Sequence, residues 1–290
     1  IRTAGRVALR VLPDRSASVR AGIVGIALST APRTARYVPL RHAGMHAGPQ
    51  MTVQAALDAL RPVLEDDTIE KVGHDLKTDA LVLARHGVSL RGLGLDTMLA
   101  SYLLDATRSG HPLEGTALEH LGYKALTEED LCGRGAKAIG LADNPPDATL
   151  NFAGERADLA LQLASELAPL LAADGLDLVY RTLEQPLVPV LVDIERAGVR
   201  VDTAALAAQS QTLERQLADL NARIVTIAGE PFNIASPQQL SRILFEKLQL
   251  PALRRNAKTR TASTAADVLE ELALSHELPR LILQWRELQK

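Results

Sequence analysis

The first hundred residues alternate between short apolar runs of strand character and longer segments with helical spacing. Residues 6–12 and 22–28 are two apolar runs separated by a polar turn, and residues 35–40 form a third, which predicts an opening three-stranded meander. Residues 50–64 then carry apolar side chains at helical spacing, and the short run 70–72 follows. Because helices and strands alternate from there on, the sequence predicts an α/β layer structure with a mixed central sheet.

Length and composition allow more than one domain. With 290 residues, 47% of them hydrophobic, the chain can bury a large core and is expected to form two domains, or one and a large part of another. The single cysteine, Cys132, excludes an internal disulfide and fits a reducing compartment. A net charge of -3 gives no global nucleic-acid signature, so any such contact must come from local patches. No apolar run reaches the length of a membrane span, so we expect a cytoplasmic protein.

The second half of the chain is predicted to be mostly helical. Residues 152–172 and 204–228 carry broad apolar faces, a pattern typical of helices packed against a core. Residues 178–196 continue this pattern with two prolines, and the short run 199–201 is expected to be a strand. Two helix starts are marked by capping residues: Thr127 with Asp130 at the third position, and Ser236 with Pro237 and Gln239 after it. A last helix over 278–290 also has an apolar face. We expect this face to pack back on the chain or against another molecule.

The segment 72–79, with the sequence Val-Gly-His-Asp-Leu-Lys-Thr-Asp, is the first candidate for chemistry. A glycine, a polar run and then helical apolar spacing predict the end of a strand turning into a helix, where side chains face a crevice. Asp75 and Asp79 are four residues apart, so one helical face can hold both carboxylates, as half of a two-metal site for phosphodiester hydrolysis. The alternative is a helix-capping Asp75 and a solvated Asp79, which the spacing alone favours.

A second candidate is the basic stretch 254–264. It contains four cations and no acid among small hydroxyl residues. Arginine, lysine and hydroxyl groups suit contacts with the phosphates of a nucleic acid. The stretch is equally explained as a solvated linker, and the sequence leaves both interpretations open.

Short motifs follow one another in a fixed order along nearly the whole chain. They lie in residues 72–79, 95–99, 185–199, 232–240, 244–245 and 258–264. Together they resemble the motifs of bacterial family A DNA polymerases, in the first part of a Klenow-type large fragment. The resemblance implies a ribonuclease H-like 3′→5′ exonuclease fold of the α/β class over residues 1–175, followed by an α-helical segment. That segment, residues 176–290, would be the opening portion of the polymerase domain, including part of its thumb.

The resemblance also implies cofactors and partners. The palm and fingers, which carry the catalytic aspartates of the polymerase, would lie beyond Lys290. We therefore expect a fragment of a DNA-directed DNA polymerase that acts in replication and repair, with Mg²⁺ as the cofactor of the complete enzyme and none in this fragment. Its partners would be primer–template DNA and the rest of the polymerase, in the bacterial cytoplasm with the nucleoid, and no membrane. The residues expected to contact duplex DNA are Arg254, Arg255, Lys258, Arg260, Ser263 and Thr264.

The exonuclease positions of the family can be compared one at a time. Active members carry Asp-x-Glu on the first strand, where this chain has Arg10 and Leu12. The aspartate of the second motif is matched by Asp79. The tyrosine and aspartate of the third motif are replaced by Phe152 and Arg156. The resemblance therefore implies a degenerate site, in which Asp79 pairs with arginines instead of metal ions.

Two metal ions about 3.5–4 Å apart need several carboxylates to offset their charge, and one aspartate is too few. We expect no catalytic residue and no bound metal, with Asp79 the only residual ligand, and neither polymerase nor exonuclease activity from this fragment. A shift in the register of the first strand would instead bring Asp14 near Asp79, but this one acid would not restore the missing ligands. Two other functions stay open: an active metal-dependent exonuclease of the DEDD type, and a non-catalytic module that binds nucleic acid through residues 254–264.

Overall fold

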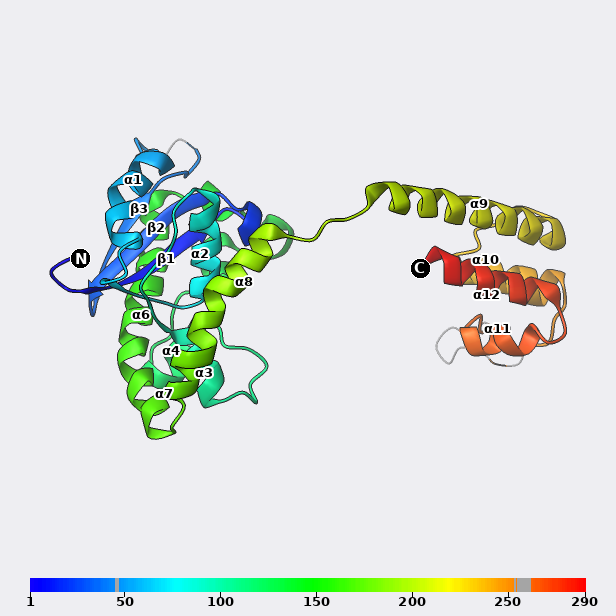
Figure 1. The fold of residues 1–290 in the computed structure, drawn as a ribbon. Helices are drawn as coiled ribbons and strands as arrows, with labels where there is room; N and C mark the ends of the chain where they lie inside the picture. Colours follow the sequence, from blue (N-terminus) through cyan, green and yellow to red (C-terminus); the bar gives the residue numbers. More distant parts are fainter. Residues whose placement is uncertain (45–46, 253, 255–261) are drawn as a thin grey trace. The chain divides into compact units, whose positions relative to one another are not determined.

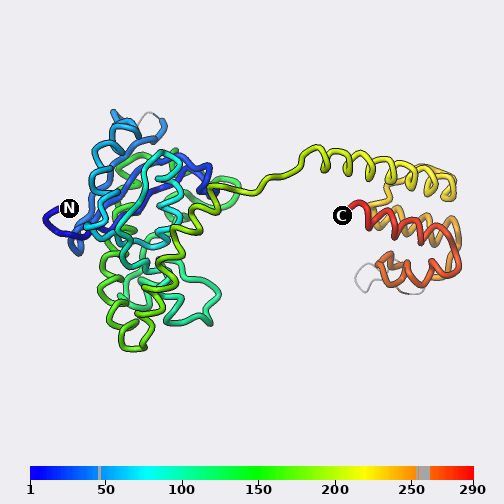
Figure 2. The backbone as a smooth tube through the Cα atoms, viewed as in Figure 1, coloured from blue at the N-terminus to red at the C-terminus, as the bar shows by residue number. Residues whose placement is uncertain are grey.

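The computed structural model describes residues 1–44, 47–252, 254 and 262–290. The chain forms two compact units, Ile1–Gly198 and Val199–Lys290 (Figure 1). Figure 2 follows the backbone through each of them. The first unit is a sheet covered by helices, and the second is helical. This arrangement confirms the predicted α/β class, a mixed sheet with helices followed by a helical segment.

The first unit is built on a five-stranded sheet with the strand order β3-β2-β1-β4-β5. The three opening strands pair antiparallel, as the predicted meander requires, while β4 and β5 add to the other edge in parallel. The sequence did not predict β5, because the glycine-rich stretch before it was expected to be a turn. The strands are β1 (Arg6–Pro13), β2 (Ile23–Ala31), β3 (Thr34–Pro39), β4 (Glu70–Gly73) and β5 (Leu93–Asp96).

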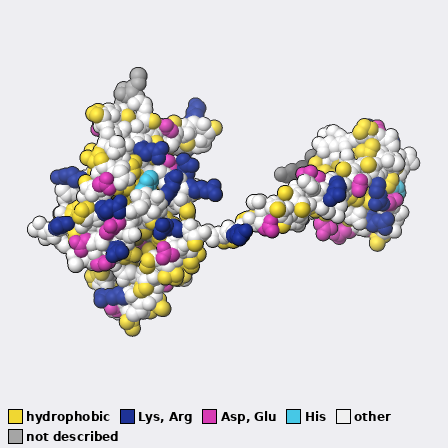
Figure 3. All heavy atoms as spheres, turned by 45° about the horizontal axis from the view of Figure 1, so that its top comes forward, with side chains coloured by type: hydrophobic (Ala, Val, Ile, Leu, Met, Phe, Trp, Pro, Cys, Tyr) yellow, Lys and Arg dark blue, Asp and Glu magenta, His cyan; other side chains and the backbone are white. Residues whose placement is uncertain are grey.

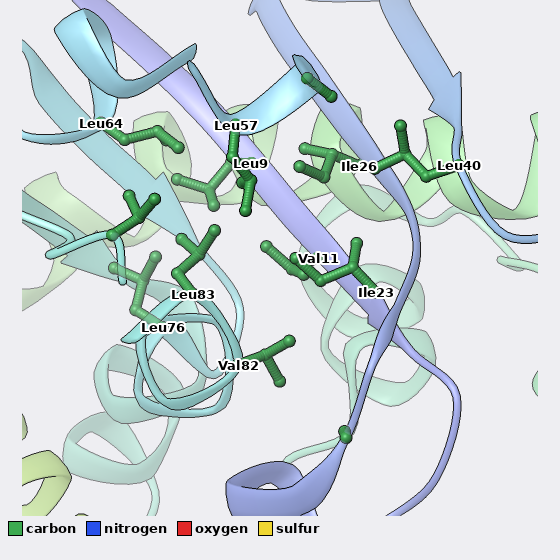
Figure 4. Close-up of a cluster of buried hydrophobic side chains, with 13 residues drawn as sticks. Leu9, Val11, Ile23, Ile26, Leu40, Leu57, Leu64, Leu76, Val82 and Leu83 are labelled. Carbon is green, nitrogen blue, oxygen red and sulfur yellow. The ribbon is translucent and has the colours of Figure 1, made fainter. Parts of the chain in front are cut away.

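Two helices, α1 (Val53–Leu64) and α2 (Leu76–Arg85), cover one face of this sheet. In Figure 4, Leu9 of β1, Leu57 of α1 and Leu83 of α2 point into a common cluster of buried side chains. All three side chains are almost inaccessible to solvent. Burying such leucines stabilises the fold by roughly 1.5–3 kcal/mol each, so this cluster holds α2 firmly against the sheet.

The 28-residue helix α6 (Pro146–Ala173) covers the opposite face. Side chains alternate along β1, so Ala8 and Leu12 are directed to this second face, and Leu12 packs in a cluster with Phe152 of α6. Arg10 lies between Ala8 and Leu12 on the same strand face. The sheet therefore directs a guanidinium toward α6 from the middle of a buried strand.

The first unit contains further short helices. One of them, α5, is capped by Thr127, whose hydroxyl accepts the Asp130 N–H in a capping box, as predicted. Another, α4, lies in a region that the sequence did not predict to be helical. These helices are η1 (Ser18–Arg20), α3 (Thr97–Leu104), α4 (Leu113–Leu121), α5 (Glu128–Cys132), η2 (Gly135–Lys137), η3 (Leu141–Asp143), α7 (Asp177–Val179), η4 (Tyr180–Glu184) and α8 (Gln185–Ala197).

Residues 176–198 pack with the first unit, so the compact units divide at Gly198 and not at the expected boundary of 175/176. The Tyr180 hydroxyl donates to the Gly94 carbonyl (2.9 Å) and accepts the Asp96 N–H (2.6 Å). Lys77 of α2 forms an ion pair with Glu195 of α8. Contacts of this kind join segments that are distant in sequence, and local patterns do not encode them.

The predicted single helix over 178–196 is interrupted by the π-helical turn η4. The predicted strand at 199–201 is wrong. Val199 has 91% of its surface exposed, and residues 198–202 have no regular secondary structure. With no neighbouring strand to take up its backbone hydrogen bonds, an apolar run this short does not become a strand.

The second unit has its own hydrophobic core. Ser236 caps α10 with Pro237 in the first turn, and its side chain accepts the Gln239 N–H, as the sequence predicted. The last helix packs back on α9, and Leu278 and Ile282 are buried there, which confirms the expectation for the C-terminal segment. The helices are α9 (Thr203–Ala228), α10 (Pro237–Ser241), η5 (Arg242–Lys247), α11 (Ala266–Leu272) and α12 (Glu277–Gln289).

Charges of both signs cover each unit on the face that Figure 3 shows. Within the described residues, no single helix combines the length and apolar character needed to cross a membrane. One bent pair, Pro146–Ala173 with Asp177–Ala197, passes this test by length and composition only, with 115° between its two parts.

Candidate functional site

The first turn of α2 is organised by aspartates. Asp75 has a left-handed backbone (φ 68°) and caps the helix, accepting the Thr78 N–H at 3.2 Å. The N–H groups of Asp75 and Leu76 donate to the two carboxylate oxygens of Asp96, at 3.0 and 2.7 Å. Burial raises the pKa of Asp96 to about 6, although these backbone donors oppose the rise. The predicted capping role of Asp75 is thus confirmed.

Asp79 is completely buried, so the alternative of a solvated carboxylate is wrong. Its Oδ1 accepts the Val11 N–H at 3.0 Å and lies 3.4 Å from Nη1 of Arg10. Its Oδ2 has no hydrogen-bond partner among the described residues. Burial raises the pKa of Asp79 to about 7, and the Arg10 guanidinium only partly offsets this effect. The pKa of this carboxyl therefore lies near neutral pH.

Arg156 does not pair with Asp79. Its Nη2 lies 2.5 Å from Glu114, because α4 packs on α6 and brings that carboxylate to it. The guanidinium also lies over the Phe152 ring, 3.8 Å from its centroid, and donates to the Leu126 carbonyl at 3.4 Å. The expectation of an arginine partner for Asp79 is correct for Arg10 and wrong for Arg156.

The structure also shows the surroundings of Leu12 and Asp14, at the end of the first strand. Leu12 is 2% exposed and belongs to the hydrophobic core. Asp14 is held at the β1–β2 turn, where it accepts the Gly22 N–H and the Arg15 Nε–H, both at 2.9 Å. Asp14 therefore serves the turn and does not complete a site around Asp79.

A hollow of about 320 Å³ lies beside these groups, at the start of α2. His74 lines it and is held between Thr97 Oγ1 (2.9 Å) and the His111 carbonyl (2.8 Å). Burial lowers the pKa of His74 to about 4, so the imidazole is neutral at pH 7. The remaining lining residues are Arg10, Asp75, Met98, His111, Pro112, Leu113, Glu114 and Arg156.

The donors around this hollow do not fit the metal pair that the exonuclease resemblance implies. Asp96 is engaged by backbone donors, Asp75 caps its helix and Glu114 is paired with Arg156. Asp79 has one buried carboxylate oxygen without a hydrogen-bond partner among the described residues, but a guanidinium lies beside this group. No group of three or more His, Cys, Asp or Glu side chains placed to hold a metal ion exists in the part of the chain that the structure describes. Two divalent ions need more anionic oxygens than this.

Sequence reasoning missed Glu114 and the environment of His74. Glu114 lies 42 residues from its partner Arg156, in a region that was expected to be mostly loop. No spacing rule joins positions so far apart. An acid just after Pro112, in the first turn of α4, was the only local signal.

The basic stretch is described only in part. Arg254 is exposed and pairs with Asp267 at 3.1 Å. The Ser263 N–H donates to the Arg254 carbonyl at 2.8 Å, and Thr264 is buried. Arg255, Lys258 and Arg260, which the sequence also predicts to bind DNA, lie outside the described residues.

Comparisons with known proteins agree with the order of these units. Residues 13–172 match the family model for 3′-5′ exonuclease, and residues 203–290 match DNA polymerase family A. The chain is 40% identical to DNA polymerase I of Pseudomonas aeruginosa, in an alignment that covers 93% of this chain. It is 38% identical to DNA polymerase I of Rhizobium leguminosarum, in an alignment that covers 100% of this chain. It spans about 30% of the length of both relatives.

A solved structure is similar to this chain in fold. It is described as the POL domain of Pol1 from M. smegmatis in complex with DNA primer-template and dNTP. The two are 25% identical with a TM-score of 0.67, over 98% of this chain and 44% of that one. The chain therefore belongs to the 3′-5′ exonuclease family through residues 13–172 and, with its family A segment at residues 203–290, aligns with part of DNA polymerase I.

Proposed function

We propose that this chain supplies the exonuclease-like domain and the opening polymerase segment of a DNA-directed DNA polymerase of the DNA polymerase I type. The two family matches in order, and relatives named DNA polymerase I that align with nearly the whole chain, support this proposal. In the complete enzyme, other segments would supply the palm and fingers with their Mg²⁺ ions. Primer–template DNA would be the partner, in replication and repair in the bacterial cytoplasm.

We further propose that the exonuclease-like domain has no nuclease activity and serves a structural role. The observation that carries this proposal is the Arg10–Asp79 contact of 3.4 Å, because a guanidinium lies beside the aspartate of the second motif. A cation at this distance repels Mg²⁺ and competes with it for the carboxylate. Arg10 and Leu12 stand where active relatives carry acids, so neither can replace the missing ligands.

The structural role is supported by contacts that residues next to the site make with distant segments. Asp96 orders the first turn of α2, and its N–H donates to Tyr180, whose hydroxyl bridges η4 to β5. Lys77 on α2 pairs with Glu195 on α8. The elements of the site thus position the helix that leads to the end of the first unit.

The nuclease part is tested with 5′-labelled single-stranded DNA in the presence of Mg²⁺ or Mn²⁺. We expect the wild-type chain, Asp79→Asn and the exposed control Asp58→Asn to leave the DNA equally intact, while a known proofreading exonuclease degrades it. Degradation by the wild type and Asp58→Asn that Asp79→Asn abolishes would establish an active exonuclease instead.

We also propose that residues 254–264 contact the phosphates of duplex DNA as part of the thumb. The four cations of this stretch and the exposure of Arg254 support the proposal. A gel-shift salt series compares the triple variant Arg255→Gln, Lys258→Gln and Arg260→Gln with the wild type. The variant should bind DNA more weakly. The slope of log affinity against log salt concentration should fall in magnitude by about 0.9 for each phosphate that is no longer neutralised.

The control for this series neutralises three exposed arginines of the first unit. It carries Arg2→Gln, Arg20→Gln and Arg36→Gln, so its net charge equals that of the loop variant. We expect the DNA affinity of the control to depend on salt concentration with the same slope as that of the wild type. Equal weakening by both triple variants would show that binding follows overall charge and not the loop.

A further inference from the structure

A groove of about 920 Å³ lies on the first unit and shares no lining residue with the hollow beside α2. Three segments line it: the β2–β3 turn with Arg33, the segment 121–126 at the end of α4, and α6. Hydrogen bonds from the first two segments end on side chains of α6. This helix therefore joins the two sides of the groove.

The two acids of α6 that line the groove fix its sides. Glu155 accepts the Tyr123 hydroxyl at 2.6 Å and the Leu126 N–H at 2.8 Å. Asp158 accepts the Arg33 N–H at 2.6 Å. Arg33 has a left-handed backbone (φ 61°), which is uncommon for a residue other than glycine, and this hydrogen bond helps to hold it there. Both sides of the groove are preformed, so a ligand binds without having to order them.

The two cations of the groove are unused. Arg33 and Lys124 are exposed, and within the part of the chain that the structure describes their side chains form neither a hydrogen bond nor an ion pair. Glu155 and Asp158, in contrast, each accept two hydrogen bonds from neutral donors. The binding capacity that is left over in the groove is thus mainly that of the cations, and it favours an acidic ligand.

The groove also has an apolar lining. Tyr123, Leu126 and Leu150 are 44%, 37% and 45% exposed, and all three line it. Single exposed apolar residues are ordinary on a protein surface, but several that gather at one hollow mark an interaction site. The groove therefore offers apolar contact area next to two free cations.

We propose that this groove is the docking site of an acidic, apolar peptide segment of a partner protein. The carboxylates of the peptide pair with Arg33 and Lys124, and its apolar side chains pack on Tyr123, Leu126 and Leu150. A nucleic acid fits less well, because the two carboxylates of α6 repel its continuous line of phosphates. A peptide places its carboxylates only at intervals. This docking goes beyond the polymerase role proposed above and does not depend on it.

The test begins with a library of random peptides displayed on phage and selected on the full chain. The soluble double variant Arg33→Gln with Lys124→Gln is present as a competitor. It removes peptides that bind other basic surfaces, such as residues 254–264, because it retains those surfaces. We expect the peptides that remain to be rich in Asp, Glu, Leu and Phe.

One selected peptide, synthesised with a fluorescent label, is then titrated with each chain and followed by fluorescence anisotropy. We expect about a tenfold loss of affinity in the double variant and a several-fold loss in Leu150→Ser. The control Arg91→Gln with Lys137→Gln removes an exposed arginine and an exposed lysine that lie outside the groove, and it should bind as the wild type does. Thermal melts check that every variant is folded.

The proposal would be overturned if no acidic, apolar peptide were selected, or if the selected peptide bound the wild type and the double variant equally. Selection of basic peptides would also overturn it, because the groove would then recognise cations through Glu155 and Asp158. A labelled oligothymidylate is titrated in the same assay. If it displaced the peptide and lost affinity in the double variant, the groove would be a nucleic-acid site and the proposal would be wrong.

Discussion

At the scale of single residues, the candidate site around Asp79 is controlled by burial. Asp79 is fully buried, accepts one backbone N–H and faces one guanidinium, while its second oxygen has no partner among the described residues. An ionised carboxylate in such a place loses more hydration than a single long ion pair restores. The protein holds this aspartate as a group that ionises only near pH 7, unlike a metal ligand, which must be charged.

This state of Asp79 predicts how stability depends on pH. Because its pKa rises from 3.8 to about 7 on folding, the folded chain binds a proton that the unfolded chain has released. The stabilisation is complete below about pH 4 and is lost as the pH rises through 7, a change of roughly 1–4 kcal/mol. Asp79→Asn removes this dependence.

Urea unfolding of wild type and Asp79→Asn at pH 4.5, 6 and 7.5 measures this difference. We expect the wild type to lose stability relative to the variant as the pH rises. His74, whose lowered pKa acts in the opposite direction, is present in both chains and cancels. A constant difference across this range would contradict the assignment.

The largely buried Arg156–Glu114 ion pair leads to a second prediction at this scale. Arg156→Met removes a charge from a largely buried pair and leaves Glu114 without its partner. We expect a loss of about 3 kcal/mol in the free energy of unfolding, measured by urea denaturation. Adding Glu114→Gln should recover part of it. The control Arg223→Met breaks an exposed pair with Glu277 and should lower the free energy of unfolding by less than about 1 kcal/mol. Equal losses of stability in Arg156→Met and Arg223→Met would show that the burial of the Arg156–Glu114 pair has no effect.

At the scale of elements, the position of β5 depends on one glycine. Gly92 has φ +64° just before the strand, and its carbonyl accepts the Lys71 N–H at 2.8 Å. A Cβ at this position would lie 2.6 Å from the Ile69 carbonyl oxygen and 3.0 Å from that of Asp66. Only glycine lets the chain pass this close to the backbone segment before β4. This close passage allows β5 to pair with β4.

Gly92→Ala is therefore expected to destabilise the chain more than Gly87→Ala. Both glycines have positive φ, but a Cβ at Gly87 meets nothing within 4 Å, so that variant costs only the backbone conformation, about 1–2 kcal/mol. The clash at Gly92 adds to this cost. Thermal melts of the two variants give the comparison, and equal midpoints would rule out the close backbone approach.

At the scale of the whole molecule, the two units have separate cores. Every cluster of buried hydrophobic side chains among the described residues draws on one unit only. The core of the second unit is formed by α9, α10, η5, α11 and α12. A unit with its own core can fold by itself.

We predict that residues 1–198 and 199–290, expressed separately, each fold. Their circular dichroism spectra, weighted by length, should sum to that of the intact chain. Dividing the chain at the boundary expected from sequence, 175/176, should instead destabilise the first piece, because it removes Tyr180 and Glu195. This division would be contradicted if residues 1–198 did not fold, or if residues 1–175 were as stable as residues 1–198.

The sequence by itself determined the features that a few neighbouring residues encode. Strand and helix periodicity predicted the meander and most helices, and capping chemistry predicted the roles of Asp75, Thr127 and Ser236. The resemblance to family A polymerases was also readable from short motifs, and the comparisons confirm it.

Only the tertiary structure decided the state of the candidate site. Whether Asp79 is solvated, which carboxylate neutralises Arg156, and where the first unit ends all depend on how α2, α4, α6 and α8 pack on the sheet and on one another. Such contacts join residues 42 to 118 positions apart, while periodicity and capping extend only a few residues along the chain. Burial and long-range pairing set the charge of a site, and both exist only once the chain has folded.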